Sequence, residues 1–231
     1  AAEPAAMAPV SRSEGGMGGR LALRASIGYG VYDAERESTG FEDTAKSPTY
    51  GLGTTFAMNF TPMFGAFADV GIDYSEVKDG VNPFWAGTGN GNFVRTDLTT
   101  TVGARLISVL QPFVGYRRAW QDASTPFDQD VWSERGTYAG LGVGPFPIGR
   151  PLRRSFSGAY NWSKVHNPPI FGGGFFDYNG ASAKLRLGLA NSPHALELRY
   201  QRFDADGPGT PDTTESYTYL VYVFTLNVLK M

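Results

Sequence analysis

Apolar and polar side chains alternate along most of the chain, and the alternation is clearest between residues 181 and 203. There Leu185 and Leu187 alternate with Lys184 and Arg186, and after a short Asn-Ser-Pro turn the same alternation returns. Successive side chains of a β-strand point to opposite faces of a sheet. The stretch therefore predicts a hairpin with one apolar face and one charged face.

The same period of two recurs in ten segments, and no stretch shows the 3.6-residue repeat of a helix. Polar, Gly-rich or Pro-rich links separate the segments, and long links alternate with short turns. The pattern therefore predicts an all-β chain. The register of the last segment stays open, because both of its faces are apolar. The predicted strands lie at about residues 20–31, 50–60, 64–75, 94–106, 114–120, 137–143, 152–162, 181–189, 196–203 and 217–228.

Composition narrows the fold class. The chain has 231 residues, of which 30 are Gly, and aromatic residues make up 14%. This mixture favours many short strands joined by turns. The longest apolar run, near Leu220 to Phe224, is far shorter than the roughly 18 residues that a transmembrane helix needs. The mean hydropathy of -0.23 is compatible with a spanning barrel, whose alternating strands average out in a hydropathy sum.

Residues 1–19 consist largely of Ala, Pro, Gly and Ser and have little to bury, so we expect a flexible tail there. Their opening has neither the basic start nor the apolar core of a signal peptide, and its small residues resemble the sequence that follows a removed one. The chain contains no Cys, which excludes disulfides.

An even number of strands, with long links at one end and short turns at the other, resembles the small outer-membrane β-barrels of the eight- to ten-stranded class. No family-specific motif carries the resemblance. It implies an up-and-down antiparallel transmembrane β-barrel of about ten strands over residues 20–231, behind a periplasmic tail over residues 1–19. It also implies a place in the outer membrane of a Gram-negative bacterium, but it carries no information about an active site. A soluble sandwich or lipocalin-like barrel is the alternative, because the same alternation could bury the apolar face.

The distribution of charge favours the membrane barrel. In this register the five long links hold sixteen acidic and four basic residues, so one end of the molecule is anionic, and a simple soluble fold gives no reason for that. The inner face is expected to carry eight basic and four acidic residues as a lumen charge network. These residues are Arg24, Asp69, Asp73, Arg95, Asp97, Arg105, Arg117, Arg153, Lys184, Arg186, Glu197 and Arg199.

The expected lumen is narrow, because a barrel of eight to ten strands has room for little more than side chains. We expect its charges to form ion pairs across it. Phe67, Phe113 and Tyr138 share the inner register and would help to fill the space. The sequence thus predicts a non-enzymatic barrel with acidic surface loops that serves as a structural or partner-binding scaffold. The alternative is a small porin-like pore whose net positive lining favours anions.

Outward-facing aromatic residues collect near the predicted strand ends. Rings of this kind mark membrane interfaces, because one part prefers hydrocarbon and the polar tip prefers the wet boundary. Ordinary packing of strand aromatics in a core is the alternative. The residues are Tyr29, Tyr50, Tyr74, Trp120, Tyr160 and Trp162 toward the long links, with Phe60 and Phe64 toward the short turns.

Arg118, Lys164 and Arg202 fall in the outward register at the long-link ends of their strands. The phosphates of lipopolysaccharide lie at that depth, and basic side chains pair well with phosphate. We therefore expect outer-membrane lipid, and lipopolysaccharide in particular, as a partner. The alternative is that these long side chains extend to the interface without a specific ligand.

Two predicted loops, at 81–87 and 167–176, are apolar where polar residues are expected. Exposed apolar patches mark interaction surfaces, so these loops would pack on each other or receive a protein partner, as the tail could. The expected contact residues are Phe84, Trp85, Ile170, Phe171, Phe175 and Phe176.

Catalytic and metal-binding signals are weak. An outer-membrane hydrolase could in principle use His166 with Asp177 or Ser163, but the spacing around His166 matches no known nucleophile motif. The acidic residues between Asp204 and Glu215 lack the spacing of a calcium loop, so we expect neither a metal nor a cofactor. A net charge of -2 without a basic patch excludes nucleic acid as a partner.

Overall fold

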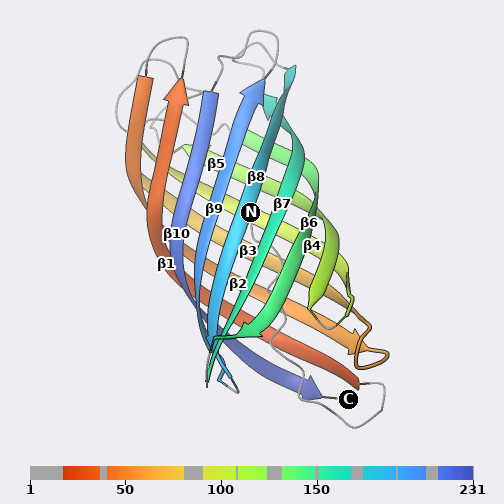
Figure 1. Ribbon diagram of the computed structural model, residues 1–231. Helices are drawn as coiled ribbons and strands as arrows, with labels where there is room; N and C mark the ends of the chain where they lie inside the picture. The colour runs from red at the N-terminus through yellow and green to blue at the C-terminus, as the bar shows by residue number, and fades with distance from the viewer. Residues whose placement is uncertain are drawn as a thin grey trace.

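The computed structural model describes residues 18–36, 41–80, 91–107, 109–123, 132–148, 151–167, 174–190, 192–206 and 213–230. In these ranges each strand pairs antiparallel with its neighbour in sequence, and β1 pairs with β10 to close the barrel (Figure 1). No helix among the described residues is long and apolar enough to cross a membrane. The strands are β1 (Gly18–Arg36), β2 (Phe41–Asn59), β3 (Gly65–Gly80), β4 (Gly91–Arg105), β5 (Leu110–Ala123), β6 (Trp132–Pro147), β7 (Leu152–Asn167), β8 (Gly174–Leu189), β9 (His194–Asp206) and β10 (Thr213–Lys230).

The fold confirms the predicted closed, up-and-down barrel of ten antiparallel strands. The strands are tilted and their long-link ends gather at the top of Figure 1. Several strands continue further into the long links than the alternation predicted. In the first link, which was expected over residues 33–47, Asp33 pairs with Thr44 and accepts a 2.8 Å hydrogen bond from its hydroxyl. Beyond the apolar wall the outer face becomes polar, whereas inner side chains such as Ala34 and Ala45 are apolar and buried. Pairing therefore continues where the apolar-out, polar-in alternation no longer holds.

The two faces of the wall have opposite chemistry. Outward side chains are apolar and accessible, for example Leu52 at 63% and Leu220 at 59% exposure. Inward side chains are buried, and they include the charged residues of the wall, for example Arg117 at 1% and Glu197 at 0% exposure. A soluble barrel would bury the apolar set, because water-exposed leucines gain nothing from folding. The soluble alternative is therefore wrong: a closed sheet with an apolar outside and a polar inside is a transmembrane β-barrel of the outer-membrane type.

The structure decides the register of β10, which the sequence left open. Tyr217, Tyr219, Val221 and Val223 are buried in the barrel, while the alternate residues, such as Leu220, face outward. Both faces of β10 are apolar because its inner face meets a cluster of buried apolar and aromatic side chains. The outer face meets lipid, so neither face needs charge.

Inner-facing glycines make room for large neighbours. A Cβ built on Gly53 would lie 2.7 Å from Arg24 Nη2, so the absence of a side chain lets that guanidinium cross the inner face of β2. A Cβ on Gly115 would lie 2.3 Å from Tyr138 Cζ. Distances of this kind are far inside van der Waals contact. Part of the high glycine content therefore serves the packing of the lumen rather than turns.

Candidate functional site

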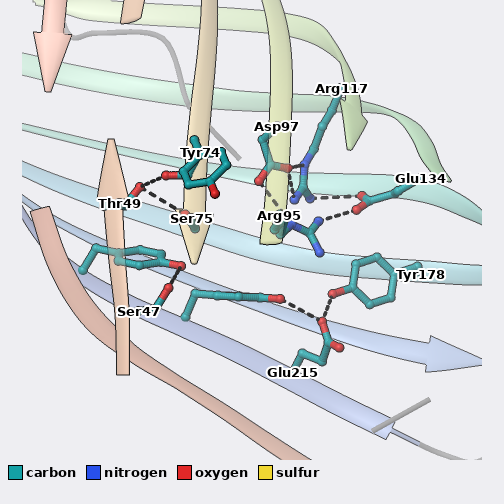
Figure 2. A network of polar contacts seen from close by, with 12 residues as sticks. Ser47, Thr49, Tyr74, Ser75, Arg95, Asp97, Arg117, Glu134, Tyr178 and Glu215 are labelled. Carbon is teal, nitrogen blue, oxygen red and sulfur yellow. Dashed lines mark hydrogen bonds and ion pairs between the residues drawn. The ribbon is translucent and has the colours of Figure 1, made fainter. Parts of the chain in front are cut away.

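Two arginines and two carboxylates form a closed ring on the inner faces of β4, β5 and β6 (Figure 2). Arg95 lies 3.1 Å from Asp97 Oδ2 and 2.5 Å from Glu134 Oε2. Arg117 lies 2.7 Å from Asp97 Oδ1 and 3.0 Å from Glu134 Oε1. We call these four residues the upper ring. Because each charge meets two of the opposite sign, the upper ring has no net charge, and its ion pairs offset part of the cost of desolvation.

A buried carboxylate, Glu215, lies beside the upper ring and is held by three tyrosines. Its Oε1 accepts a hydrogen bond from Tyr32 at 3.2 Å, and its Oε2 accepts one from Tyr217 at 3.2 Å and a shorter one from Tyr178. Figure 2 shows the hydroxyl of Tyr178 directed at this carboxylate. Arg95 stacks over the Tyr217 ring at 5.5 Å, which joins this group to the upper ring.

A second network occupies the half of the lumen nearer the short turns. Glu197 is at its centre: Arg199 binds its Oε2 through Nε at 2.9 Å and Nη2 at 2.8 Å, and Arg186 binds its Oε1 at 3.1 Å. Arg199 also reaches Asp73 Oδ1 at 3.5 Å, across the barrel from β9 to β3. We call these four residues the lower network. It ties strands that are distant in the barrel wall.

The remaining predicted lumen charges lie outside these two networks. Arg24 lies 3.7 Å from Asp69 Oδ1, and the other oxygen of Asp69 accepts a 2.5 Å hydrogen bond from Thr55. Lys184 is buried on the inner face. Arg105 and Arg153 are half-buried toward the short-turn ends of β4 and β7, and no ion pair joins either of them to a described residue.

Apolar side chains fill the lumen between these polar groups. A cluster around Tyr32, Phe93 and Phe203 lies toward the long links, and Arg117 stacks over the Phe203 ring at 4.6 Å. A smaller cluster of Phe67, Phe113 and Tyr138 lies toward the short turns, as the inward register predicted. Two cavities of about 20 Å³ each lie among the described inner side chains. A cavity of that size holds a water molecule but no larger solute.

The sequence missed two acids of this lumen, Glu134 and Glu215, because it placed them in the long links. The structure puts both on strands with buried, inward side chains. They follow the alternation of their strands, Glu134 two residues before Gly136 and Glu215 two before Tyr217. A longer reading of the period-two pattern could have found Glu134, but not Glu215, because the register of the last segment stays open in the sequence. The prediction that all sixteen link acids form an external anionic end is therefore wrong for these two.

The three outward basic residues lie where the register placed them, on the outer faces of β5, β7 and β9. They do not form one group. Lys164 lies 3.3 Å from Asp177 on the next strand, and Arg202 lies 3.5 Å from Asp204 on its own strand. Arg118 stacks over the ring of Trp120 at 4.7 Å.

The proposed apolar loop contacts are only partly visible. Phe84, Trp85, Ile170 and Phe171 lie outside the described residues. The structure places Phe175 and Phe176 on β8 rather than in a loop. Phe175 faces outward against the His166 ring at 5.0 Å, and Phe176 is buried in the lumen. The two rings therefore belong to opposite faces of the wall and cannot form one loop patch.

The hydrolase trio does not come together as a catalytic arrangement. Ser163 is buried on the inner face of β7, whereas His166 lies three residues further on the outer face. Asp177 is on the outer face of β8, where it pairs with Lys164. A nucleophile and its base must be within hydrogen-bond reach, and side chains on opposite faces of a sheet are not. Among the described residues no group of His, Cys, Asp and Glu could hold a metal ion.

No protein-family model and no curated protein matches the sequence. The structure is similar to an outer-membrane channel from Pseudomonas putida F1 (9% identity, 98% of this chain and 100% of that chain, TM-score 0.49). It is also similar to the translocator domain of the autotransporter NalP from Neisseria meningitidis (14% identity, 89% of this chain and 88% of that chain, TM-score 0.40). A third similar structure is the outer membrane protein OprG from Pseudomonas aeruginosa (12% identity, 92% of this chain and 98% of that chain, TM-score 0.30). Likenesses of this size carry no inference about ligand or activity.

Proposed function

We propose that this outer-membrane barrel is a non-enzymatic, non-conducting scaffold, whose long-link end carries the surface that a partner recognises. The observation that supports this most directly is the filling of the lumen. The upper ring, the tyrosines around Glu215 and the lower network follow one another along the barrel. Most of the large inner side chains among them are buried, and Arg117, Tyr32, Tyr178, Tyr217 and Glu197 are at most 2% exposed. A solute would have to displace these ion pairs in order to pass.

The charge of the lumen favours a structural role over an anion path. In the upper ring two basic residues meet two acidic ones, so no net positive potential lines that part of the barrel. Breaking such a ring leaves a charge buried without its partner, which is strongly unfavourable. An anion-favouring pore would instead need exposed basic side chains along a continuous water-filled path.

Conductance across planar lipid bilayers tests the proposal. The refolded barrel is expected to give no steady conductance steps. A variant that removes large inner side chains, Tyr32→Ala with Phe93→Ala and Phe203→Ala, is expected to conduct, which shows that insertion is detectable. Steady, anion-selective steps from the unaltered chain would overturn the scaffold and support the pore. Hydrolysis of a peptide or lipid substrate that is lost in His166→Ala would instead support an enzyme.

A further inference from the structure

Three basic side chains lie side by side on the outer wall of β5, β6 and β7. Arg118 stands directly opposite Arg135, and Arg135 stands directly opposite Lys164. Directly opposed residues of an antiparallel pair have Cβ atoms about 4.5–5.5 Å apart. The three residues therefore form one row across three neighbouring strands, which we call the basic row.

Register, not sequence spacing, creates the basic row. The sequence suggested Arg118, Lys164 and Arg202 as a set and placed Arg135 in a long link. The structure extends β6 so that Arg135 lies between the first two on the outer face. Arg202 lies two strands beyond Lys164, on β9, beside its own carboxylate partner Asp204. The row thus replaces the set that the sequence suggested.

The basic row lies at the edge of the apolar wall. On the short-turn side its next outward neighbours include Tyr116 and Trp162, both exposed, and the wall below them is aliphatic and aromatic. On the long-link side the next outward residue of β6 is Ser133, where polar positions begin. Trp120 lies beside Arg118 and stacks under its guanidinium. Tyrosine and tryptophan prefer the depth of the lipid headgroups, so the basic row lies at that depth.

The basic row carries more positive charge than its neighbours neutralise. Like charges directly opposite each other destabilise a sheet. Asp177 pairs with Lys164, but among the described residues no carboxylate forms an ion pair with Arg118 or Arg135. An anion seated over the two arginines would remove this repulsion.

We propose that the basic row binds the phosphate groups of a lipid headgroup in the outer leaflet, of the lipopolysaccharide kind. Arginine presents a planar fork of donors that matches phosphate oxygens, and such charge-assisted hydrogen bonds are strong. Side chains that only extend to the interface would need no alignment on neighbouring strands. The proposal does not depend on whether the lumen conducts, since the basic row lies on the opposite face of the wall.

Native mass spectrometry of the purified barrel in nonionic detergent tests the proposal. Bisphosphorylated lipid A is the titrant, and heat-modifiable migration shows that each variant is folded. In Arg118→Gln/Arg135→Gln the apparent affinity is expected to fall about tenfold or more, the effect of losing one or two charge-assisted hydrogen bonds. Arg118→Lys/Arg135→Lys keeps the charge and is expected to recover part of the binding.

Arg202→Gln is the matched control, because it removes one outward positive charge from the same wall at a place away from the basic row. It is expected to bind lipid A as the unaltered chain does. Equal binding by the Arg118→Gln/Arg135→Gln variant, or an equal loss in Arg202→Gln, would overturn the proposal. If inorganic phosphate binds as tightly as lipid A, the inference that the phosphate belongs to a lipid headgroup is wrong. If the double variant does not fold, Lys164→Gln, whose side chain is exposed, provides the same comparison.

Discussion

Arg117 on β5 donates from Nε and Nη2 to a single oxygen of Asp97 on β4, Oδ1, at 2.9 and 2.7 Å. The other oxygen of Asp97 accepts from Arg95 Nε at 3.1 Å. One carboxylate thus bridges two guanidinium groups, and all three side chains are buried in the lumen. In hydrocarbon or in a filled lumen no bulk water can replace a lost partner.

Asp97→Ala is therefore expected to destabilise the barrel by about 3–5 kcal/mol, because it leaves two buried guanidinium groups with only Glu134 between them. Urea unfolding in detergent micelles, followed by tryptophan fluorescence, measures the loss. Asp204→Ala removes an exposed partner of Arg202 and should change stability by about 0–1 kcal/mol. If Asp97→Ala lowers the free energy of unfolding by no more than Asp204→Ala does, water reaches the upper ring.

The three tyrosines around Glu215 predict a graded response. Tyr32→Phe removes one hydrogen bond to the carboxylate and is expected to lower the free energy of unfolding by about 1 kcal/mol. Glu215→Leu leaves three buried hydroxyls without their acceptor, so its loss should exceed that of Tyr32→Phe by roughly the desolvation of those hydroxyls, about 1–3 kcal/mol each. Equal losses in the two variants would show that the carboxylate is not the common acceptor.

Close packing against inner glycines can be tested by a single methyl group. Gly115→Ala would place its Cβ 2.3 Å from Tyr138 Cζ and 2.4 Å from Thr100 O, so we expect a loss of about 1–3 kcal/mol. Gly188→Ala is the matched control, because its nearest neighbour atom, Ala195 Cβ, would be 3.7 Å away. Thermal migration shifts of the folded band measure both variants. If Gly115→Ala is as stable as Gly188→Ala, the close packing described for the smaller apolar cluster is contradicted.

The lipid-facing wall predicts a depth-dependent effect of charge. Leu220 faces outward in the middle of β10, and Leu220→Arg should destabilise the barrel by about 2–4 kcal/mol if that position lies near mid-membrane. Thr214→Arg, on the same face near the long-link end, should change stability by about 0–1 kcal/mol. Refolding yields and unfolding in lipid vesicles give the comparison. The reverse order would mean that the membrane lies elsewhere along the strands.

The sequence by itself determined which face of most strands points outward. Lys184 and Arg186 alternate with leucines, and one step of register would turn every charge toward lipid, so local patterning suffices. It also determined the all-β class, the closure expected from ten such strands, and the inner position of all twelve predicted lumen charges. These properties follow from the alternation of side chains within one strand, which does not depend on which strand pairs with it.

Only the tertiary structure decided which side chains meet. Arg199 contacts Asp73 across 126 residues of sequence, and Arg135 reaches the basic row only because β6 extends beyond its alternating segment. It also decided the register of β10, whose two faces look alike because one meets lipid and the other meets buried rings. The physical reason is the same in each case: pairing between strands is set by the stagger of the whole closed sheet, which no single segment encodes.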